Sequence, residues 1–231
     1  MTYAPGVLGF YVNGNFIGTA TGTHAPSGFM FGSSGTANAQ TFAGYIDEFR
    51  IYSRVLSANE IAYLANISTP QPNFDLTVAP ATMAAYFPFN GSLADASGNN
   101  RTLTQTGSIS YVTGVNGMKA VYLANEAAVS GGTAASNYVT SSYTFPSNFT
   151  VAFWVNMTQL HATNNIGIFH TTSSINAVQN NIQIFYWKGG SAFQTAFASS
   201  LSANIVVDAN PVGKWYHFTL AFASGTLSYY C

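Results

Sequence analysis

The sequence predicts an all-β protein built as an antiparallel sandwich, and three observations support this prediction. Short runs rich in aromatic and β-branched residues follow one another along the chain, separated by Gly, Asn and Ser turns. Hydrophobic residues make up 48% of the 231 residues and aromatic residues 15%, which is ample for a core between two sheets. Only 6% of the residues are charged, against about 25% in average globular proteins, so Ser, Thr, Asn, Gln and Gly must form the polar surface.

The composition also excludes several classes of function. The formal net charge is −1 and the six Lys and Arg residues are scattered, so there is no electrostatic footprint for nucleic acid. No stretch approaches the ~18 consecutive apolar residues of a membrane span. Cys231 is the single cysteine, which excludes an internal disulfide. We therefore expect neither a nucleic-acid partner nor a membrane span.

The first part of the chain predicts four strands and one helix. Residues 7–20, VLGFYVNGNFIGTA, form two strands around Asn13-Gly14, a strong hairpin signal. Further strands are expected within 27–34 and 41–53. The helix covers 57–66, because Ser57 and Glu60 have the spacing of a capping box, in which each side chain satisfies a free backbone N–H group.

A linker and a second series of strands follow. Residues 68–80, STPQPNFDLTVAP, contain three prolines and little periodicity, which is typical of a linker. The run 149–157 alternates well, with Val151, Phe153 and Val155 on one face. Strands are expected within 83–93, 108–114, 118–125, 137–143, 149–157, 165–172, 181–189, 193–200 and 215–222.

Four segments resemble the laminin G-like, concanavalin A-like lectin/glucanase family of jelly-roll domains. Residues 43–64, AGYIDEFRIYSRVLSANEIAYL, are similar to its closing strand and short helix. Residues 84–100, AAYFPFNGSLADASGNN, resemble its opening segment, and 149–156 and 214–222 resemble its middle strands. The resemblance implies a jelly-roll β-sandwich with one short helix near 57–66.

The order of these segments differs from that of the family, because the closing segment comes before the opening one. The two ends of the chain are also similar, since residues 3–12 and 222–231 share Ala4/Ala223, Gly6/Gly225, Leu8/Leu227 and Tyr11/Tyr230. We interpret residues 1–67 as the C-terminal third of one repeat of a tandem array and 81–231 as the N-terminal two-thirds of the next. The two parts are expected to complete one circularly permuted sandwich; the alternative is completion of a neighbouring chain by domain swapping.

Catalysis is not expected from the acidic residues. Glycanases of this fold need two carboxylates on one face, about 5–5.5 Å apart in retaining enzymes. Asp47 and Glu48 are adjacent, so a regular strand would point them to opposite faces. Glu48 and Arg50 are better interpreted as an ion pair, and the four histidines show no metal or triad spacing.

One polar loop has the residues of a calcium site. Residues 95–100, DASGNN, offer oxygen ligands from Asp95 and Asn99, and Asp208 could contribute from elsewhere in the chain. Calcium prefers six to eight oxygens, which this loop alone does not supply. The alternative is an Asx-turn, in which Asp95 accepts hydrogen bonds from nearby backbone N–H groups. Calcium is the only cofactor that the sequence suggests.

Sugar-binding chemistry is concentrated in residues 179–190, QNNIQIFYWKGG. Alternation would turn Ile182, Ile184 and Tyr186 to the core and leave an aromatic platform and amide groups on the other face. The candidate glycan ligands are Trp187, Gln183, Asn181 and Lys188, of which Lys188 suits an acidic sugar. The alternative is that Trp187 packs as a structural residue.

The sequence therefore predicts a non-catalytic, lectin-like binding module for glycans or glycoproteins. The charge-poor composition of the chain resembles that of tandem copies of this family in large DNA viruses. This resemblance implies an extracellular or virion-surface location. Neighbouring repeats or a second copy of the chain are the other expected partners. The alternative function is a structural or assembly module with no small ligand.

Overall fold

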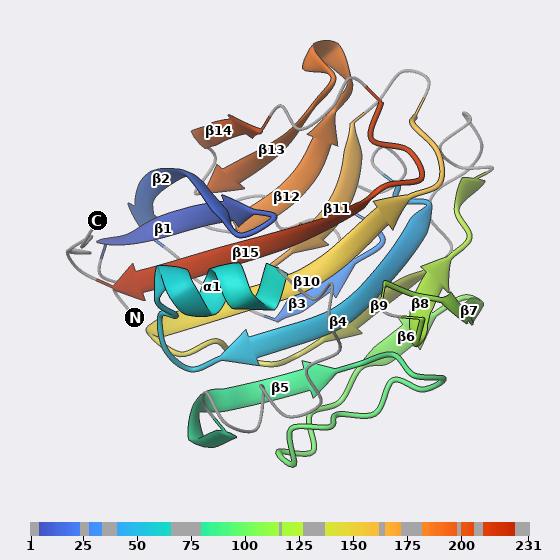
Figure 1. Cartoon of the computed structure of the whole chain (residues 1–231), viewed down its shortest axis with the longest axis horizontal. Helices are drawn as coiled ribbons and strands as arrows, with labels where there is room; N and C mark the ends of the chain where they lie inside the picture. Colours follow the sequence, from blue (N-terminus) through green and yellow to red (C-terminus); the bar gives the residue numbers. More distant parts are fainter. Residues whose placement is uncertain are drawn as a thin grey trace.

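Two antiparallel sheets pack face to face in the computed structural model, which confirms the predicted β-sandwich (Figure 1). The structure describes residues 5–23, 28–33, 41–65, 80–115, 117–126, 137–161, 165–171, 182–197, 200–205 and 210–224. Residues 68–79 of the predicted linker lie outside these ranges.

The first sheet has eight strands in the order β2-β1-β15-β10-β4-β8-β7, with β5 also paired to β4. Its strands are β1 (Pro5–Val12), β2 (Asn15–Thr23), β4 (Gly44–Tyr52), β5 (Met83–Phe87), β7 (Ile109–Thr113), β8 (Lys119–Leu123), β10 (Asn148–Met157) and β15 (Trp215–Ser224).

The second sheet has seven strands in the order β14-β13-β12-β11-β3-β9-β6. Its strands are β3 (Phe29–Phe31), β6 (Thr104–Thr106), β9 (Tyr138–Ser141), β11 (Ile166–His170), β12 (Ile182–Trp187), β13 (Ala192–Phe197) and β14 (Ser200–Ile205). β6 and β14 were not predicted from the sequence, because TQT is only three residues long with no large apolar side chain, and SLSANI has no aromatic residue and one β-branched residue, Ile205. Two short 3-10 helices, η1 (Pro80–Thr82) and η2 (Lys188–Gly190), complete the regular elements.

Strands from early in the chain lie inside both sheets. In the first sheet β4 lies between β10 and β8, and in the second β3 lies between β11 and β9. Figure 1 shows the same arrangement for β1, whose blue ribbon runs beside the red ribbon of β15. The N-terminal strands therefore contribute to the same core as the strands from the middle and end of the chain.

The core between the sheets is dominated by phenylalanine. Val151, Phe153 and Val155 of β10 all reach it, which confirms the alternation predicted for this strand. Phe49 of β4 lies at the centre of the aromatic packing, with its ring centroid 5.0–6.3 Å from those of five other rings. These rings belong to Phe29, Phe31, Phe87, Phe153 and Phe169. The packing ties both sheets together through one side chain.

The hairpin between β1 and β2 turns at Asn13 and Gly14, as predicted. Both residues have positive φ, 49° and 78°, which is the conformation that a two-residue turn of type I′ needs. The Asn13 N–H donates to the carbonyl of His217 at 2.8 Å, and the Asn13 side chain accepts from the His217 N–H at 2.9 Å. The turn is thereby attached to β15 as well.

The single α-helix among the described residues, α1 (Ala58–Ala65), covers the outer face of the first sheet (Figure 1). Its capping box is confirmed, since the Glu60 carboxylate accepts from the Ser57 N–H at 2.8 Å and the Ser57 hydroxyl accepts from the Glu60 N–H at 3.4 Å. Arg54 donates two further bonds to Glu60 and holds the pKa of that carboxyl at about 2. Ile61 and Leu64 turn inward onto the sheet.

A bulge in β4 changes the direction of its acidic residues. The pairing with β10 shifts register between Ala152 and Trp154, and Glu48 has a φ of 55°. Strict alternation therefore does not apply between Asp47 and Glu48, and the expectation that they point to opposite faces is wrong. Glu48 forms the predicted ion pair with Arg50 and also accepts from the Tyr86 hydroxyl at 2.8 Å.

Candidate functional site

The predicted sugar platform is positioned by β12. Ile182, Ile184 and Tyr186 lie in the core, so the alternation predicted for this strand is confirmed. Trp187 is 37% exposed at the end of the strand, which makes it an accessible aromatic side chain and not a core residue. The geometry of β12 therefore leaves Trp187 available to a ligand.

The other predicted glycan ligands are not all gathered around Trp187. Lys188 follows it directly and its N–H donates to the Asn165 side chain at 3.1 Å. Gln183 is half-buried and lies four residues away along β12, which places it about 13 Å from Trp187 at ~3.3 Å per residue. Asn181 lies outside the described residues. Of the three candidates that the structure describes, Trp187 and Lys188 lie together and Gln183 does not.

The predicted calcium loop forms an Asx-turn around Asp95. The Asp95 carboxylate accepts hydrogen bonds at 2.8–2.9 Å from the N–H groups of Tyr86, Ser97 and Arg101 and from the Ser97 hydroxyl. Partial burial raises the pKa of Asp95, but these hydrogen bonds outweigh burial and lower it below the usual value. Asp95 therefore stays ionised at neutral pH and ties β5 to the loop.

Calcium binding at this loop stays a prediction. The Asn99 amide donates to the Met83 carbonyl at 2.8 Å, and Asp208 lies outside the described residues. Among the described residues, no three His, Cys, Asp or Glu side chains are grouped so as to hold a metal ion. A rise in melting temperature on adding Ca²⁺ that Asp95→Asn abolishes would support the site, and an identical melting temperature with Ca²⁺ and with chelator would count against it.

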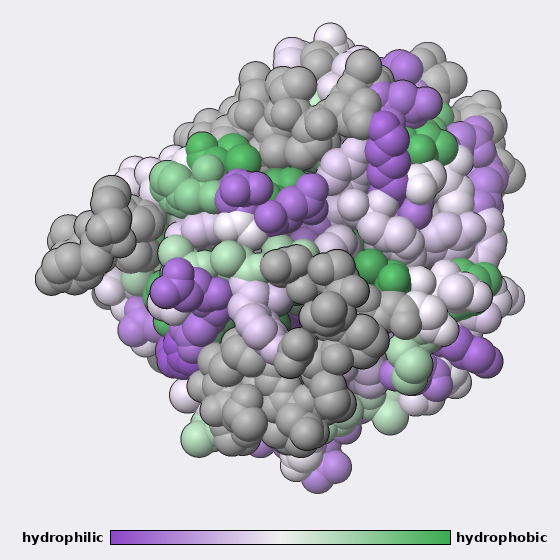
Figure 2. Space-filling view, viewed as in Figure 1, coloured by the Kyte–Doolittle hydropathy of each residue, from purple (hydrophilic) through white to green (hydrophobic). Residues whose placement is uncertain are grey.

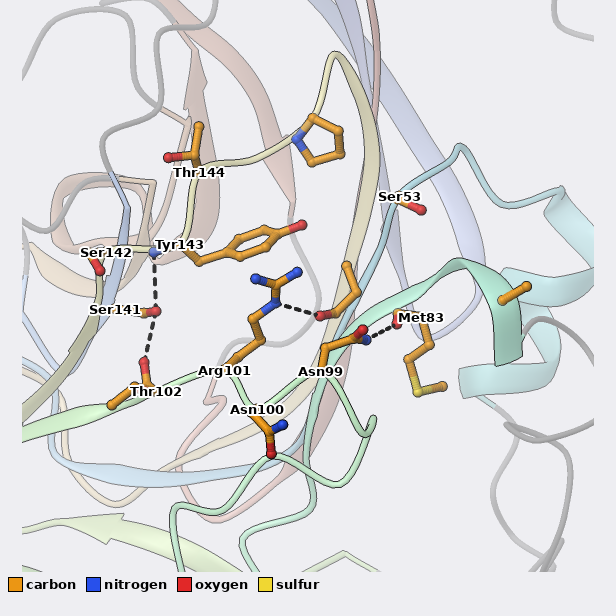
Figure 3. A pocket seen from close by; sticks show the side chains of 13 residues that line it. Ser53, Met83, Asn99, Asn100, Arg101, Thr102, Ser141, Ser142, Tyr143 and Thr144 are labelled. Carbon is orange, nitrogen blue, oxygen red and sulfur yellow. Dashed lines mark hydrogen bonds between the residues drawn. The ribbon is translucent and has the colours of Figure 1, made fainter.

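A cleft of about 660 Å³ opens beside this loop and was not predicted from the sequence. Three parts of the chain form its walls. The first is the end of β9 and the residues after it, the second is segment 99–102 after the Asp95 turn, and the third is the region around η1. Figure 3 shows the polar side chains that surround it. Five of them bear on ligand binding, namely Asn100, Arg101, Ser142, Tyr143 and Thr144.

Arg101 and Tyr143 form the centre of the cleft (Figure 3). The Arg101 guanidinium lies over the Tyr143 ring, 5.0 Å from its centroid, in a cation–π contact. The Arg101 Nε–H donates to the carbonyl of Ala84 at 3.2 Å, which fixes the plane of the guanidinium. Its two Nη groups form no ion pair with an Asp or Glu of the described residues, so they remain as charged donors in the cleft.

Tyr143 is held from its backbone. Its N–H donates to the Ser141 hydroxyl at 3.2 Å, and that hydroxyl donates to the Thr102 carbonyl at 3.0 Å. The ring meets Phe145 edge-on with centroids 5.3 Å apart. Burial raises the pKa of Tyr143 above 10, so its hydroxyl remains protonated and can donate a hydrogen bond.

The lining of the cleft is suited to a neutral or anionic polar ligand. Within the described part of the chain, no hydrogen-bond partner is seen for the side chains of Asn100, Ser142 and Thr144. The described lining residues include no Asp or Glu. The cleft therefore offers hydroxyl, amide and guanidinium groups next to one aromatic ring, and no carboxylate to serve as an acid, a base or a nucleophile.

Sequence reasoning missed this site because its parts are distant in the chain. The loop around Asp95 was recognised as polar from the sequence. However, Arg101 precedes β6 and Tyr143 follows β9, and no local pattern indicates that these two residues meet. On the face seen in Figure 2, the described residues are mostly white to purple and the green atoms form separate groups.

The fold is that of an antiparallel β-sandwich domain. The chain belongs to the concanavalin A-like lectin/glucanases superfamily of laminin G-like domains, whose family model matches residues 1–62 and 130–231. No curated protein and no solved structure matches the chain. The match omits 63–129, so Arg101 lies outside the matched ranges and Tyr143 lies inside them. None of the described helices is long and apolar enough to cross a membrane.

Proposed function

We propose that the protein is a non-catalytic glycan-binding module and that the cleft around Arg101 and Tyr143 is its binding site. The observation that supports this function is the set of uncommitted polar groups around one aromatic ring in a cleft of about 660 Å³. Ligand sites are concave and use a few fixed polar groups to orient the ligand. Here the lining is largely polar, which favours a ligand that is itself rich in hydroxyl groups.

Arg101 would be the main recognition group of this site. Its guanidinium presents a planar fork that matches two oxygen atoms of one ligand, and the contact with Tyr143 and the bond to Ala84 hold that fork in place. Neutral amide and hydroxyl groups from Asn100, Ser142 and Thr144 lie around it. Neighbouring hydroxyls of a sugar ring have the spacing and the donor–acceptor character that such a set can satisfy.

The absence of catalysis is supported by the carboxylates nearest the cleft. Glycoside hydrolysis requires a carboxylic acid with a raised pKa and a second carboxylate across the scissile bond. The Asp95 carboxyl beside the cleft has a lowered pKa and accepts four hydrogen bonds, so it is neither a proton donor at neutral pH nor a free nucleophile. The described residues that line the cleft therefore supply neither of the two carboxylates that this mechanism needs.

We also propose where such a module acts. The charge-poor surface and the family suit a domain displayed outside the cell or on a virion, in contact with glycoproteins and with other copies of itself. Multiple copies would convert weak binding at each cleft into avid attachment, because later contacts become intramolecular.

Replacing Arg101 by Gln is expected to weaken glycan binding at least about tenfold. A hydrogen bond to a charged group contributes about 1.5–3 kcal/mol, which corresponds to about 10- to 150-fold in affinity. The measurement is a glycan array in calcium and again in chelator, followed by titration of the best ligand. Arg101 is exposed, so the variant is expected to keep the melting temperature of the unaltered protein within about 2 °C.

Two control variants distinguish the cleft from the Trp187 surface. Lys188→Gln removes a different partly exposed cation, and Trp187→Ala removes the exposed indole. Loss of binding in Trp187→Ala with unchanged binding in Arg101→Gln would transfer the site to β12. No binding to any glycan by protein shown to be folded would favour the structural or assembly module instead.

A further inference from the structure

The outer face of the first sheet carries a row of side chains that the core does not use. In β10, Val155 and Met157 point into the core, so Asn156 between them points outward. Asn156 pairs directly with Trp215 of β15 on one side and with Tyr45 of β4 on the other. Because directly paired residues lie on the same face of a sheet, these three side chains stand side by side across three adjacent strands.

Two aromatic rings lean over Asn156. Since β10 lies between β15 and β4, the backbones of these two strands are about 9–10 Å apart. The ring centroids of Trp215 and Tyr45 are only 6.1 Å apart, so the two rings approach each other above Asn156. The ring of Tyr122 on β8 continues the row, 5.1 Å from that of Tyr45. The three rings, each half-buried, form an aromatic strip, and Asn156 beneath it is 6% exposed.

A second row of outward side chains lies next to the first. Trp154 precedes Asn156 by two residues in β10 and pairs with His217 on one side and Asp47 on the other. Nine buried side-chain nitrogen and oxygen atoms have no hydrogen-bond partner among the described residues, and four of them belong to these adjoining positions. They are Asn156 Oδ1, Trp154 Nε1, Asp47 Oδ1 and His217 Nε2. Unpaired polar atoms are therefore concentrated in one small area, which we call the outer patch.

The outer patch is separate from both α1 and the cleft. The helix packs on Ala152 and Ala221, and Figure 1 shows it over the half of β10 that is farther from the arrowhead. Asn156 lies near the end of β10 that bears the arrowhead. Ser53 of the cleft follows the last residue of β4, whereas Tyr45 of the outer patch is near its start. At ~3.3 Å per residue the two sites are about 25 Å apart.

The unpaired atoms define the chemistry of a ligand. A buried polar group without a partner costs about 1–3 kcal/mol, so such groups normally have one in a protein, in a ligand or in ordered water. Asn156 Oδ1 requires a hydrogen-bond donor, and the Trp154 indole N–H requires an acceptor. An ammonium group only donates, and a carboxylate or sulfate only accepts. A hydroxyl group does both, so it is the one of these groups that satisfies both atoms.

A carboxylate at the end of the aromatic strip restricts the ligand further. The Tyr122 hydroxyl donates to Glu126 Oε1, which also accepts from the Thr158 hydroxyl at 3.2 Å. These two bonds hold the carboxylate beside the strip and leave its second oxygen as a further acceptor. Its negative charge disfavours an acidic ligand, which is the opposite of the preference that Arg101 gives to the cleft.

We infer that the outer patch is a second ligand site and that it binds the hydroxyl groups of a neutral sugar unit. Asn156 and Trp154 supply an acceptor and a donor next to each other, and the aromatic strip supplies a surface for the apolar C–H groups of a sugar ring. Ordered water has the same hydrogen-bonding chemistry as a sugar hydroxyl but makes no use of the rings. The test below separates these two sources.

The test is a titration of the full chain, followed by tryptophan fluorescence. Two of the three tryptophans, Trp154 and Trp215, lie in the outer patch and report on it. The probes are the methyl glycosides of glucose, galactose, mannose and N-acetylglucosamine, with the methyl glycoside of glucuronic acid as the acidic probe. All titrations use the Arg101→Gln background, so that a signal does not depend on the cleft.

We expect a saturable change in fluorescence with at least one neutral probe. The acidic probe is expected to bind at least about threefold more weakly than the methyl glucoside. Asn156→Leu should raise the dissociation constant of the neutral probe at least about fivefold. The same variant should keep or raise the melting temperature, because it removes a buried polar atom that has no partner. Tyr45→Ala retains all three tryptophans and should weaken binding at least about threefold.

Four results would overturn the inference. A titration without saturation for every neutral probe means that the unpaired atoms hold ordered water alone. Equal binding of the acidic probe and the methyl glucoside contradicts a neutral ligand. An unchanged dissociation constant in Asn156→Leu, or in Tyr45→Ala if the first variant does not fold, removes the site from the outer patch. Loss of the signal in Trp187→Phe assigns it to β12. Failure of the cleft as a glycan site is a different result, seen as equal glycan-array binding by Arg101→Gln and the unaltered protein.

Discussion

Replacing Asp47 by Asn is expected to raise the free energy of unfolding by about 2–4 kcal/mol at pH 8 and to leave it almost unchanged at pH 4. Asp47 is 1% exposed and pairs across the sheet with Trp154. Its Oδ2 accepts from the Val115 N–H at 3.0 Å, whereas its Oδ1 has no hydrogen-bond partner among the described residues. The ionised carboxylate is therefore poorly solvated in the folded protein.

The sign of this effect follows from the pKa of Asp47. Burial raises it from 3.8 to about 7, against the lowering effect of the Val115 N–H, and the neighbouring Glu48 raises it further. Between these two values the folded protein retains a proton that the unfolded chain releases, so stability falls as pH rises from about 4 to about 7. Each pKa unit corresponds to about 1.36 kcal/mol, which sets the upper limit of about 4 kcal/mol. Asn is neutral at every pH, so the Asp47→Asn variant does not lose this part of its stability as the pH rises.

Two buried histidines act in the opposite direction. Burial lowers the pKa of His217 from 6.5 to about 3 and that of His170 to about 4. Here the unfolded chain binds protons that the folded protein excludes, so stability falls as pH drops from about 6.5 toward these values. Urea unfolding at pH 4, 6 and 8 should show that the free energy of unfolding rises more steadily with pH in Asp47→Asn than in the unaltered protein. An equal difference between the two proteins at pH 4 and pH 8 would contradict the raised pKa of Asp47.

Replacing Gly44 by Ala is expected to lower the free energy of unfolding by more than about 3 kcal/mol. A Cβ at this position would lie 2.2 Å from the Asn156 carbonyl oxygen and 3.0 Å from the Met157 Cα. Both atoms belong to the backbone of β10, so the clash can be relieved only by separating β4 from β10 at the centre of the first sheet. A clash with backbone is costly because no side chain can turn aside.

Gly18→Ala is the matched control for this prediction. Gly18 lies in β2, at the edge of the same sheet, and a Cβ there would meet nothing within 4 Å. The same change is expected to alter stability by less than about 1 kcal/mol, because it adds no clash and only reduces the freedom of the unfolded chain. Thermal unfolding of the two variants side by side gives the comparison. Equal melting temperatures would mean that β4 and β10 can separate at little cost.

Features set by neighbouring residues could be predicted from the sequence. Asn13-Gly14 specifies its turn because both residues accept positive φ, and Ser57 with Glu60 specifies a helix start because each reaches the other within one turn. The alternation in β10 and β12 decides which side chains enter the core, and the exposure of Trp187 follows from it. The family follows from several such segments together.

The bulge at Glu48 shows where local reasoning fails. Regular alternation separates Asp47 from Glu48, but the extra residue in β4 forms only because the strand must match β10 on one side and β5 and β8 on the other. That match depends on four strands together, and the local sequence YIDEF, residues 45–49, contains no pattern that predicts it. Both buried carboxylates, and with them the expected pH dependence, depend on it.

The sequence by itself determined the β-sandwich, its family, the short helix and the core faces of β10 and β12, because each of these depends on patterns within short segments of the chain. Only the tertiary structure decided that Arg101 lies over Tyr143, that Asp47 and Glu48 are both buried, and that residues 6–12 pair with β15. The physical reason is that these contacts join segments whose distance in space is set by the packing of two whole sheets.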